Sequence, residues 1–446
     1  MTRSVHEPAR DVPVYGEYEM VVLGGGPAGI AAAAAAAGLG RKTLLVERYG
    51  FLGGMGTAAG VTTFCGLFAN IFGEHRQVVH GVAAELQERI DRIGGLNKPH
   101  VVFGKIMGQA YDTAAYKRAA DGMLLDRSAE ILFHALGAGV VMDGQRIAAL
   151  LVETKSGRRA ILGEVFIDGS GDGDLAAWAG APFELGDGHG GMLYPTMMFR
   201  VNGVDPVAAG EAWRTIPELM AEAEKRGAKF PRKGAIVRPQ RNPIEWRVNV
   251  TQMKNPDGSA LDGTDARALS GGEIEGRRQV GTFMDFLRSE VPGFGNAYVV
   301  DTPPQLGIRE TRRITGAYAY SSEDVLTCAS FDDTIGVNGW PLEQHVAGDV
   351  VWGWPPIPES RGFSHLPFRM VLPQEVDNLM VVGRCASMTH EGQSAARVSG
   401  ACFVMGQAAG TAAHLALAGN AGPADIPVAA LQAALERDGA YLGRDR

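Results

Sequence analysis

The sequence predicts an α/β fold in which short apolar strands run into glycine turns and then into helices. In residues 18–38 an apolar run, a glycine turn and an alanine-rich segment follow one another. A second β-like run, residues 42–46, is followed by an acid. Runs that end in glycine recur at residues 160–173 and 376–383. Short apolar runs bounded by glycine are typical of buried strands.

The turn at residues 24–29 has the spacing Gly-x-Gly-x-x-Gly between a strand and a helix. In this context Gly24 permits the tight turn, Gly26 lets a pyrophosphate approach the backbone, and Gly29 lets the helix pack close to the strand. Free N–H groups at the helix start then bind phosphate. Glu47 follows 47 − 29 = 18 residues after Gly29, which suits a carboxylate that accepts from ribose hydroxyls. The pattern predicts a Rossmann-like dinucleotide site; the alternative is a Rossmann-like fold that has lost its ligand.

The composition is that of an ordinary globular protein with an acidic balance. Hydrophobic residues make up 46% of the 446 positions, charged residues 21%, and the net charge is −8. A chain of this length exceeds one compact core and predicts two intertwined domains. The negative balance disfavours binding to nucleic acid or to anionic membranes.

The cysteines and the long apolar runs indicate the cellular compartment in which the protein is expected. The cysteines form no CxxC pair and no metal-ligand spacing, so we expect reduced thiols, a cytoplasmic protein and no bound metal. Two long uncharged runs, residues 21–40 and 398–424, contain many glycines or polar residues, and we expect buried helices there, not membrane spans. No targeting segment is visible.

Changes of pattern along the chain predict its organisation. Residues 81–93 and 112–128 have helical apolar spacing, and strand-like runs joined by hairpin turns follow up to residue 167. From residue 184 arginine, proline and aromatic residues increase, and residues 246–251 alternate as a sheet strand does. We expect an N-terminal arm at 1–16, a nucleotide-binding domain at 17–183 that returns at 371–424, an inserted antiparallel-sheet substrate domain at 184–370, and a C-terminal helix or tail at 425–446.

Several sequence blocks together carry a resemblance to a known family. They are residues 24–29, 46–48, 50–55, 167–174, 247–251, 292–294, 306–313, 366–369, 378–384 and 406–410. In these blocks the chain resembles the FAD-dependent oxidoreductases of the glutathione-reductase-like, two-dinucleotide-binding-fold superfamily. Within it, the chain is most similar to the bacterial group called "FAD-dependent oxidoreductase". One departure is Gly-Ser at residues 169–170, where the superfamily usually has Ala-Thr.

The resemblance implies FAD as the cofactor and assigns residues to it. Glu47 would hold the adenosine ribose, the backbone near Gly139 and Val140 would reach the adenine, and the helix that begins near residues 396–399 would aim its N-terminus at the flavin. The resemblance also implies cofactor contacts for Gly24, Gly26, Pro27, Ala28, Gly29, Arg48, Gly53, Gly54, Met55, Thr57, Asp168, Gly169, Gly383 and Arg384. A covalent flavin link at Cys65 is conceivable.

Few side chains suit proton transfer or substrate binding. His390 stands between the Gly383 turn and the last long helix, and imidazole titrates near neutral pH; a structural helix cap is the alternative. His365 is the second candidate base, or a loop histidine. Arg309 and Arg312 could bind a carboxylate or polarise a carbonyl, or form an ion-pair network with Glu310 and Asp324. Tryptophans at 340, 352 and 354 and Phe363 could line a substrate pocket or simply pack.

These observations favour an FAD enzyme that oxidises a small organic substrate by hydride transfer to the flavin, as a dehydrogenase or an oxidase. No second dinucleotide fingerprint and no redox CxxC follow, so electrons would leave to oxygen, a quinone or a carrier, or arrive from nicotinamide without a dedicated site. A single-component flavin monooxygenase is the alternative, although such enzymes usually carry Gly-Asp where this chain has Gly383-Arg384. A non-catalytic binding protein on this fold is a second alternative. A homo-oligomer is possible.

Overall fold

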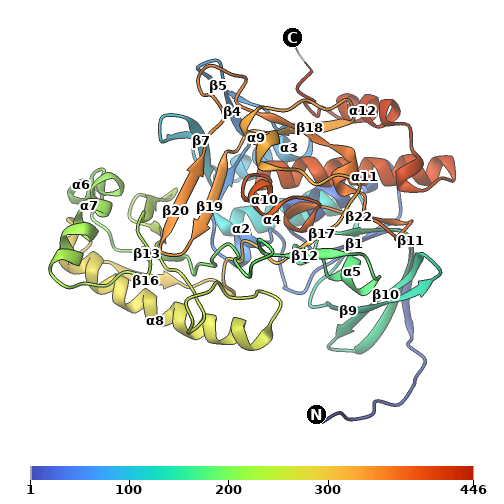
Figure 1. Cartoon of the computed structure of the whole chain (residues 1–446), viewed down its shortest axis with the longest axis horizontal. Coiled ribbons are helices and arrows are strands. Elements are labelled where there is room, and N and C mark those ends of the chain that lie inside the picture. The colour runs from blue at the N-terminus through green and yellow to red at the C-terminus, as the bar shows by residue number, and fades with distance from the viewer. Residues whose placement is uncertain (1–2, 445–446) are drawn as a thin grey trace.

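The computed structural model describes residues 3–444 and has a mixed α/β architecture, which confirms the α/β class (Figure 1). Its largest sheet has seven strands in the order β8-β2-β1-β11-β10-β9, with β22 beside the end of β11. Strands β8, β2, β1, β11 and β22 are parallel, whereas β10 is antiparallel to both β11 and β9. The strands span Val14–Leu23 (β1), Thr43–Val46 (β2), Glu130–Leu132 (β8), Leu136–Asp143 (β9), Arg146–Thr154 (β10), Gly157–Asp168 (β11) and Leu379–Val381 (β22).

Two small-residue helices, α1 (Pro27–Gly38) and α11 (Ser399–Gly419), pack directly against each other next to this sheet. A Cβ added at Gly406 would lie 2.0 Å from the carbonyl oxygen of Ala28, and one at Gly410 would lie 2.2 Å from that of Ala32. The two backbones therefore touch, which only glycine on α11 and alanine on α1 permit. This contact joins the returning chain to the first strand–helix unit.

Of the described residues, one helix, α11, is long and apolar enough to cross a membrane by length and composition. However, 78% of its most apolar window is buried inside the protein. Its apolar composition is explained by its place in the core between α1 and the strand β18 (Thr334–Asn338). The sequence predicts a helix that begins near residues 396–399; in the structure a shorter helix, α10 (His390–Ala396), precedes it, and residues 397–398 separate the two helices before α11 begins.

A second sheet, entirely antiparallel, has the order β14-β15-β13-β16 and its own apolar core (Figure 1). Helices α7 (Ala212–Lys225) and α8 (Ala266–Glu290) contribute to this core. The strands span Phe199–Asn202 (β13), Ile236–Pro239 (β14), Trp246–Asn249 (β15) and Tyr298–Asp301 (β16). The alternating apolar and polar residues at 246–251 thus correspond to a strand, β15, which contains a buried tryptophan.

Further helices and short strands lie outside these two sheets, and one hairpin among them contacts the region of the second sheet. The hairpin β19–β20 reaches the second sheet, where Lys233 N–H donates to Gly348 O at 2.9 Å and Gln252 donates to Val346 O at 2.9 Å. These elements are α2 (Met55–Ala58), β3 (Thr63–Cys65), β4 (Phe68–Ile71), β5 (Glu74–Gln77), α3 (Val82–Arg92), β6 (His100–Val102), β7 (Ile106–Ala110), α4 (Thr113–Leu125), α5 (Asp174–Trp178), β12 (Phe183–Leu185), α6 (Pro206–Ala209), β17 (Arg312–Ile314), α9 (Ser322–Leu326), β19 (Leu342–Val346), β20 (Asp349–Gly353), β21 (Ser364–Pro367) and α12 (Val428–Arg437), with short 3₁₀ turns at Phe368–Val371, Gly383–Cys385 and Pro423–Asp425.

The sequence predictions for individual elements agree with these bounds at most positions. The helices expected at 81–93 and 112–128 correspond to α3 and α4, and the two expected hairpin turns join β9, β10 and β11. Residues 3–13 of the expected N-terminal arm form no helix or strand. Residues 1–2 of that arm and residues 445–446 of the expected tail lie outside the described residues.

Candidate active site

One continuous cavity lies where the carboxyl ends of the parallel strands meet the second sheet. It is lined at one end by the glycine turn before α1 and at the other by side chains of β14, β15 and β19. A crevice outside the carboxyl ends of parallel strands is the usual ligand position in open α/β sheets. The turn side is lined by Gly24, Gly25, Gly26, Pro27, Ala28, Glu47, Arg48, Tyr49, Gly54, Met55, Gly169, Ser170, Gly171, Gly383 and Arg384.

The three glycines of the turn are required for different reasons. Gly24 has φ +101°, and its Cβ would lie 2.4 Å from Gly169 O; a Cβ at Gly29 would lie 1.8 Å from Gly24 O. Protein packing therefore excludes any side chain at these two positions. Gly26 has φ −76°, and its Cβ would meet only the Cα of Gly54, at 3.7 Å. Nothing in the protein demands glycine at 26, and the space beside it is the cavity, so this cradle fits a phosphate group that approaches the backbone.

Glu47 joins the end of β2 to the glycine turn. Its Oε2 accepts from Gly25 N–H at 2.7 Å and its Oε1 accepts from Tyr49 N–H at 2.9 Å. Burial raises the pKa of this carboxyl, although the two backbone hydrogen bonds oppose the shift. Each carboxylate oxygen can accept more than one hydrogen bond, so Glu47 can hold the turn and still bind ligand hydroxyls.

The loop after Glu47 contributes lining residues and supporting residues. Gly54 and Met55 line the cavity. Thr57 and Gly53 lie behind them: Thr57 Oγ1 donates to Leu52 O at 2.8 Å, and a Cβ at Gly53 would lie 2.4 Å from Thr57. On α4 the hydroxyl of Tyr116, which also lines the cavity, is buried and has no hydrogen-bond partner within the protein.

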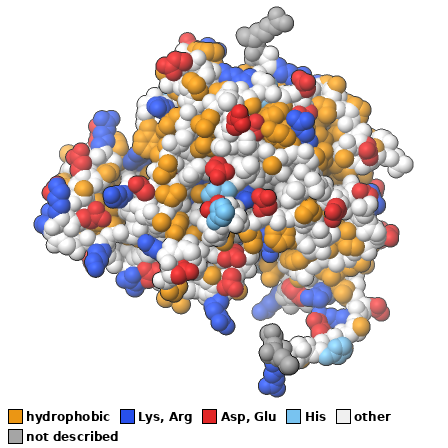
Figure 2. Space-filling model, in the orientation of Figure 1, with side chains coloured by type: hydrophobic (Ala, Val, Ile, Leu, Met, Phe, Trp, Pro, Cys, Tyr) orange, Lys and Arg blue, Asp and Glu red, His pale blue; other side chains and the backbone are white. Residues whose placement is uncertain are grey.

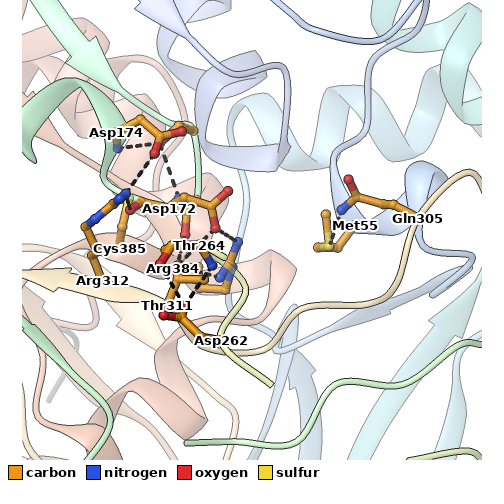
Figure 3. Close-up of polar contacts among 12 residues, drawn as sticks. Met55, Asp172, Asp174, Asp262, Thr264, Gln305, Thr311, Arg312, Arg384 and Cys385 are labelled. Carbon is orange, nitrogen blue, oxygen red and sulfur yellow. Dashed lines mark hydrogen bonds and ion pairs between the residues drawn. The ribbon is translucent and has the colours of Figure 1, made fainter. Parts of the chain in front are cut away.

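At the ends of β11 and β22, Gly169, Gly383 and Arg384 line the cavity, whereas Asp168 does not. Asp168 accepts from Ser170 N–H at 3.0 Å and from Ala176 N–H at 3.0 Å, so it organises the strand end. Burial raises the pKa of Asp168 to about 6. Arg384 donates to Asp172 at 2.8 Å and to Thr311 at 3.0 Å, beside the Arg312–Asp174 ion pair at 2.8 Å (Figure 3). Arg384 is thus held in place by its own contacts.

The far wall of the cavity contains residues that the sequence analysis did not select as site residues. Glu343 Oε1 lies 3.0 Å from Nε2 of His345, and Trp340 Nε1–H donates to Glu343 Oε2 at 3.0 Å. The set comprises His100, Phe103, Arg238, Arg247, Asn249, Glu343, His345, Arg397 and Ser399. Arg247 and Asn249 stand in one of the resemblance blocks, and Arg397 and Ser399 lie at the helix start expected near the flavin. No local signal marks the others, because they come from β14, from β19 and from β6 and the residue after it. Trp340 and Trp352 line the same wall, but Trp354 and Phe363 do not.

Arg309 lines the cavity, and its Nη1 donates to Tyr194 O and Thr196 Oγ1, both at 2.6 Å. The expected ion pairs of Arg309 and Arg312 with Glu310 and Asp324 are wrong. Arg312 pairs with Asp174, and Glu310 pairs with Arg313. Arg309 faces the cavity instead.

Besides Gly29, Gly53, Thr57 and Asp168, which support the lining from behind, four further residues assigned from the sequence do not line this cavity. Gly139 and Val140 lie within β9, paired with Leu151 and Leu150 of β10, because the strand extends past the predicted adenine contact. Nδ1 of His365 accepts from Phe331 N–H at 3.2 Å and its Nε2 lies 3.0 Å from Gly443 O, so its ring is used in packing the C-terminal segment. His390 Nδ1 lies 2.9 Å from Glu310. We therefore do not retain these four in the site.

Cys65 lines the cavity, and burial raises the pKa of its thiol to about 12. The thiol is therefore protonated at neutral pH and is a poor nucleophile. All four cysteines are free. Within residues 3–444, no group of three or more His, Cys, Asp or Glu side chains is arranged to hold a metal ion.

Comparison with known proteins identifies the family. A model of the FAD dependent oxidoreductase family matches residues 19–435, so the chain belongs to this family, is an enzyme and uses FAD. The cradle at Gly26 and the acceptor Glu47 fit this cofactor. No curated protein matches the chain.

Solved structures resemble the fold. The FAD-dependent halogenase CndH, a myxobacterial chondrochloren halogenase, superposes with a TM-score of 0.50 at 13% identity, covering 95% of this chain and 79% of that chain. A geranylgeranyl bacteriochlorophyll reductase-like protein from Thermoplasma acidophilum gives 0.49 at 14% identity, with 95% and 83% covered. p-Nitrophenol 4-monooxygenase PnpA from Pseudomonas putida DLL-E4 gives 0.47 at 12% identity, with 97% and 90% covered. At such identities the likeness concerns the fold alone.

Proposed function

We propose that this enzyme oxidises a small organic substrate, as a dehydrogenase or an oxidase, in a glutathione-reductase-like arrangement whose antiparallel sheet forms the substrate side. FAD, when bound, supplies the two-electron acceptor for a hydride from the substrate. The supporting observation is that one cavity joins the phosphate cradle at Gly26 to a wall with a buried histidine, arginines and tryptophans. Substrate and cofactor can therefore share one space between the two sheets.

The start of α11 supports the redox role. Val398, Ser399 and Cys402 in and before its first turn line the cavity, and the helix runs to Gly419. The unpaired N–H groups and the dipole at a helix start stabilise negative charge. Negative charge that develops in this part of the cavity during reduction is thus favoured by a fixed dipole.

We propose His345 as the group that accepts the substrate proton. Burial alone would raise the pKa of Glu343, but its hydrogen bond from His345 and the charge of Arg397 lower it to about 2, so Glu343 is ionised. An ionised carboxylate accepts only, so we assign the proton to Nε2 of His345. Burial and the charge of Arg309 lower the pKa of His345, so its ring is neutral before the reaction, and the adjacent carboxylate of Glu343 would stabilise the imidazolium formed when Nδ1 accepts the proton.

A single-component monooxygenase is the second candidate, favoured by the aromatic wall. The rings of Phe103 and Trp352 are 5.2 Å apart and those of Trp340 and Trp352 are 6.2 Å apart, which suits a planar substrate. Such an enzyme would consume NADPH faster when an aromatic substrate is added.

The test is to purify the yellow protein and screen candidate substrates for anaerobic bleaching of the flavin band. Bleaching followed by rapid re-oxidation in air indicates an oxidase, and bleaching without it a dehydrogenase. NADPH oxidation that depends on an aromatic substrate, without direct bleaching by that substrate, would replace this proposal by the monooxygenase.

A further inference from the structure

The far wall of the cavity carries more positive than negative side chains. Four arginines line it, Arg238, Arg247, Arg309 and Arg397, against one carboxylate, Glu343. Arg384, nearer the glycine turn, already pairs with Asp172. The two histidines of this wall do not change the balance, because burial lowers the pKa of both His100 and His345.

The arginines of this wall are held mainly by neutral groups. Arg247 is 7% exposed, and its Nη1 donates to Val61 O at 2.9 Å while its Nε is buried without a partner. Arg397 donates to Glu343 O at 3.2 Å, and its Nε is likewise buried without a partner. Arg309 is 5% exposed and bonds a carbonyl and a hydroxyl through Nη1. Among the residues that the structure describes, Arg397 alone of these four arginines has a charged partner, Glu343 at 4.0 Å.

Buried guanidinium groups with so few counter-charges are costly unless an anion joins them. Arginine stays protonated in proteins, and burial merely lowers the pKa of Arg238 to about 10. Removing a cation from water without a paired anion is strongly unfavourable. The face of the molecule drawn in Figure 2 does not share this excess, since acidic and basic side chains are interspersed on it. The positive charge is therefore a property of the cavity itself.

The place that fits the phosphates of FAD differs from the place where these arginines lie. The cradle at Gly26 lies at the start of α1, whereas Arg238 and Arg247 stand on β14 and β15 of the second sheet. Next to the arginines, Trp340, Trp352 and Val102 present an apolar surface. An anionic group and an apolar body thus meet complementary parts of one wall.

We infer that the substrate is a small organic carboxylate, with its anionic end bound by Arg247, Arg309 and Arg397 and its apolar body against Trp340 and Trp352. The planar guanidinium fork matches a carboxylate and can bind it in a bidentate manner. This inference rests on the proposed function and names the substrate class of the same site.

The experiment uses the FAD-loaded protein and matched pairs of a carboxylate and its neutral amide: acetate and acetamide, benzoate and benzamide, phenylacetate and phenylacetamide. Binding is followed by the flavin difference spectrum and by tryptophan fluorescence at constant ionic strength. We expect at least one carboxylate to bind about tenfold or more tightly than its amide, with the larger acids ahead of acetate. Carboxylates that bind no better than their amides would overturn the inference, while a yellow protein reduced by a neutral substrate would leave the proposed function intact.

Arg247→Gln and, independently, Arg397→Gln remove one cation each. We expect either variant to weaken the binding of the preferred carboxylate by about tenfold or more and to change the binding of its amide little. Arg278→Gln is the control, because Arg278 lies on the exposed face of α8, paired with Glu275. Equal loss of acid and amide binding in both cavity variants, or no loss in either, would overturn the arginine assignment. A colourless wild-type protein would instead contradict the proposed function.

Discussion

Nε2 of His345 lies 3.0 Å from Oε1 of Glu343 in the wall of the cavity, where the side chain of His345 is buried and that of Glu343 is 13% exposed. A carboxylate that orients an imidazole is a recurrent way to prepare a base, because it fixes the tautomer and stabilises the imidazolium that forms. The sequence analysis had favoured His390, whose nearest anion is Glu310 outside the cavity lining.

We predict that His345→Gln slows anaerobic flavin reduction about a hundredfold or more, with unchanged FAD content, because a general base contributes at least that factor. Stopped-flow absorbance of the flavin band with the identified substrate measures the rate. His189→Gln, at an exposed position, is the control. A slow His390→Gln variant together with a normal His345→Gln variant would restore His390 as the base.

Gly26→Val is expected to yield folded protein without FAD. The substituted side chain finds room within the protein, where Gly26 has only Gly54 nearby at 3.7 Å, but it enters the phosphate cradle. The ratio of flavin to protein absorbance and the far-ultraviolet circular dichroism measure the two effects. Gly271→Ala, at an open position of α8, is the control. A fully yellow Gly26→Val protein would refute the cradle.

The stability contributed by Glu343 should depend on pH with a definite sign. Its pKa is about 2 in the folded protein, against 4.5 for the unperturbed group, so the folded state favours the ionised form. This contribution is present above pH 4.5 and is lost as the pH falls toward 2. We expect the difference in melting temperature between wild type and Glu343→Gln to shrink over that interval. A difference that does not vary with pH would contradict the ionised pair.

The stability contributed by His390 should depend on pH in the opposite direction. Burial would lower its pKa, but the hydrogen bond and charge of Glu310 outweigh burial, and the pKa is raised above 6.5. Its contribution is therefore complete below pH 6.5 and is lost as the pH rises through the folded pKa. Melting temperatures of wild type and His390→Gln at pH 6 and pH 9 should differ more at pH 6. Nuclear magnetic resonance titration of the imidazole gives the pKa directly.

The contact between α1 and α11 predicts a large effect at Gly406. A Cβ there would lie 2.0 Å from Ala28 O, so Gly406→Val must separate two core helices and is expected to cost at least about 3 kcal/mol of unfolding free energy. Chemical denaturation measures the loss. Gly419→Ala, with open space around it at the end of the same helix, should change little. A stable Gly406→Val protein would show that the helices can part.

The sequence by itself determined the glycine turn, the acid at 47, the α/β class and the family. These depend on short-range patterns: Gly24, Gly26 and Glu47 lie within one strand–helix–strand unit whose geometry follows from local sequence. What the tertiary structure alone decided is the far wall of the cavity. Arg247, Arg397 and the Glu343–His345 pair of β19 come from separate segments, and whether a polar side chain faces a cavity or a neighbour depends on packing between those segments, which no local pattern encodes.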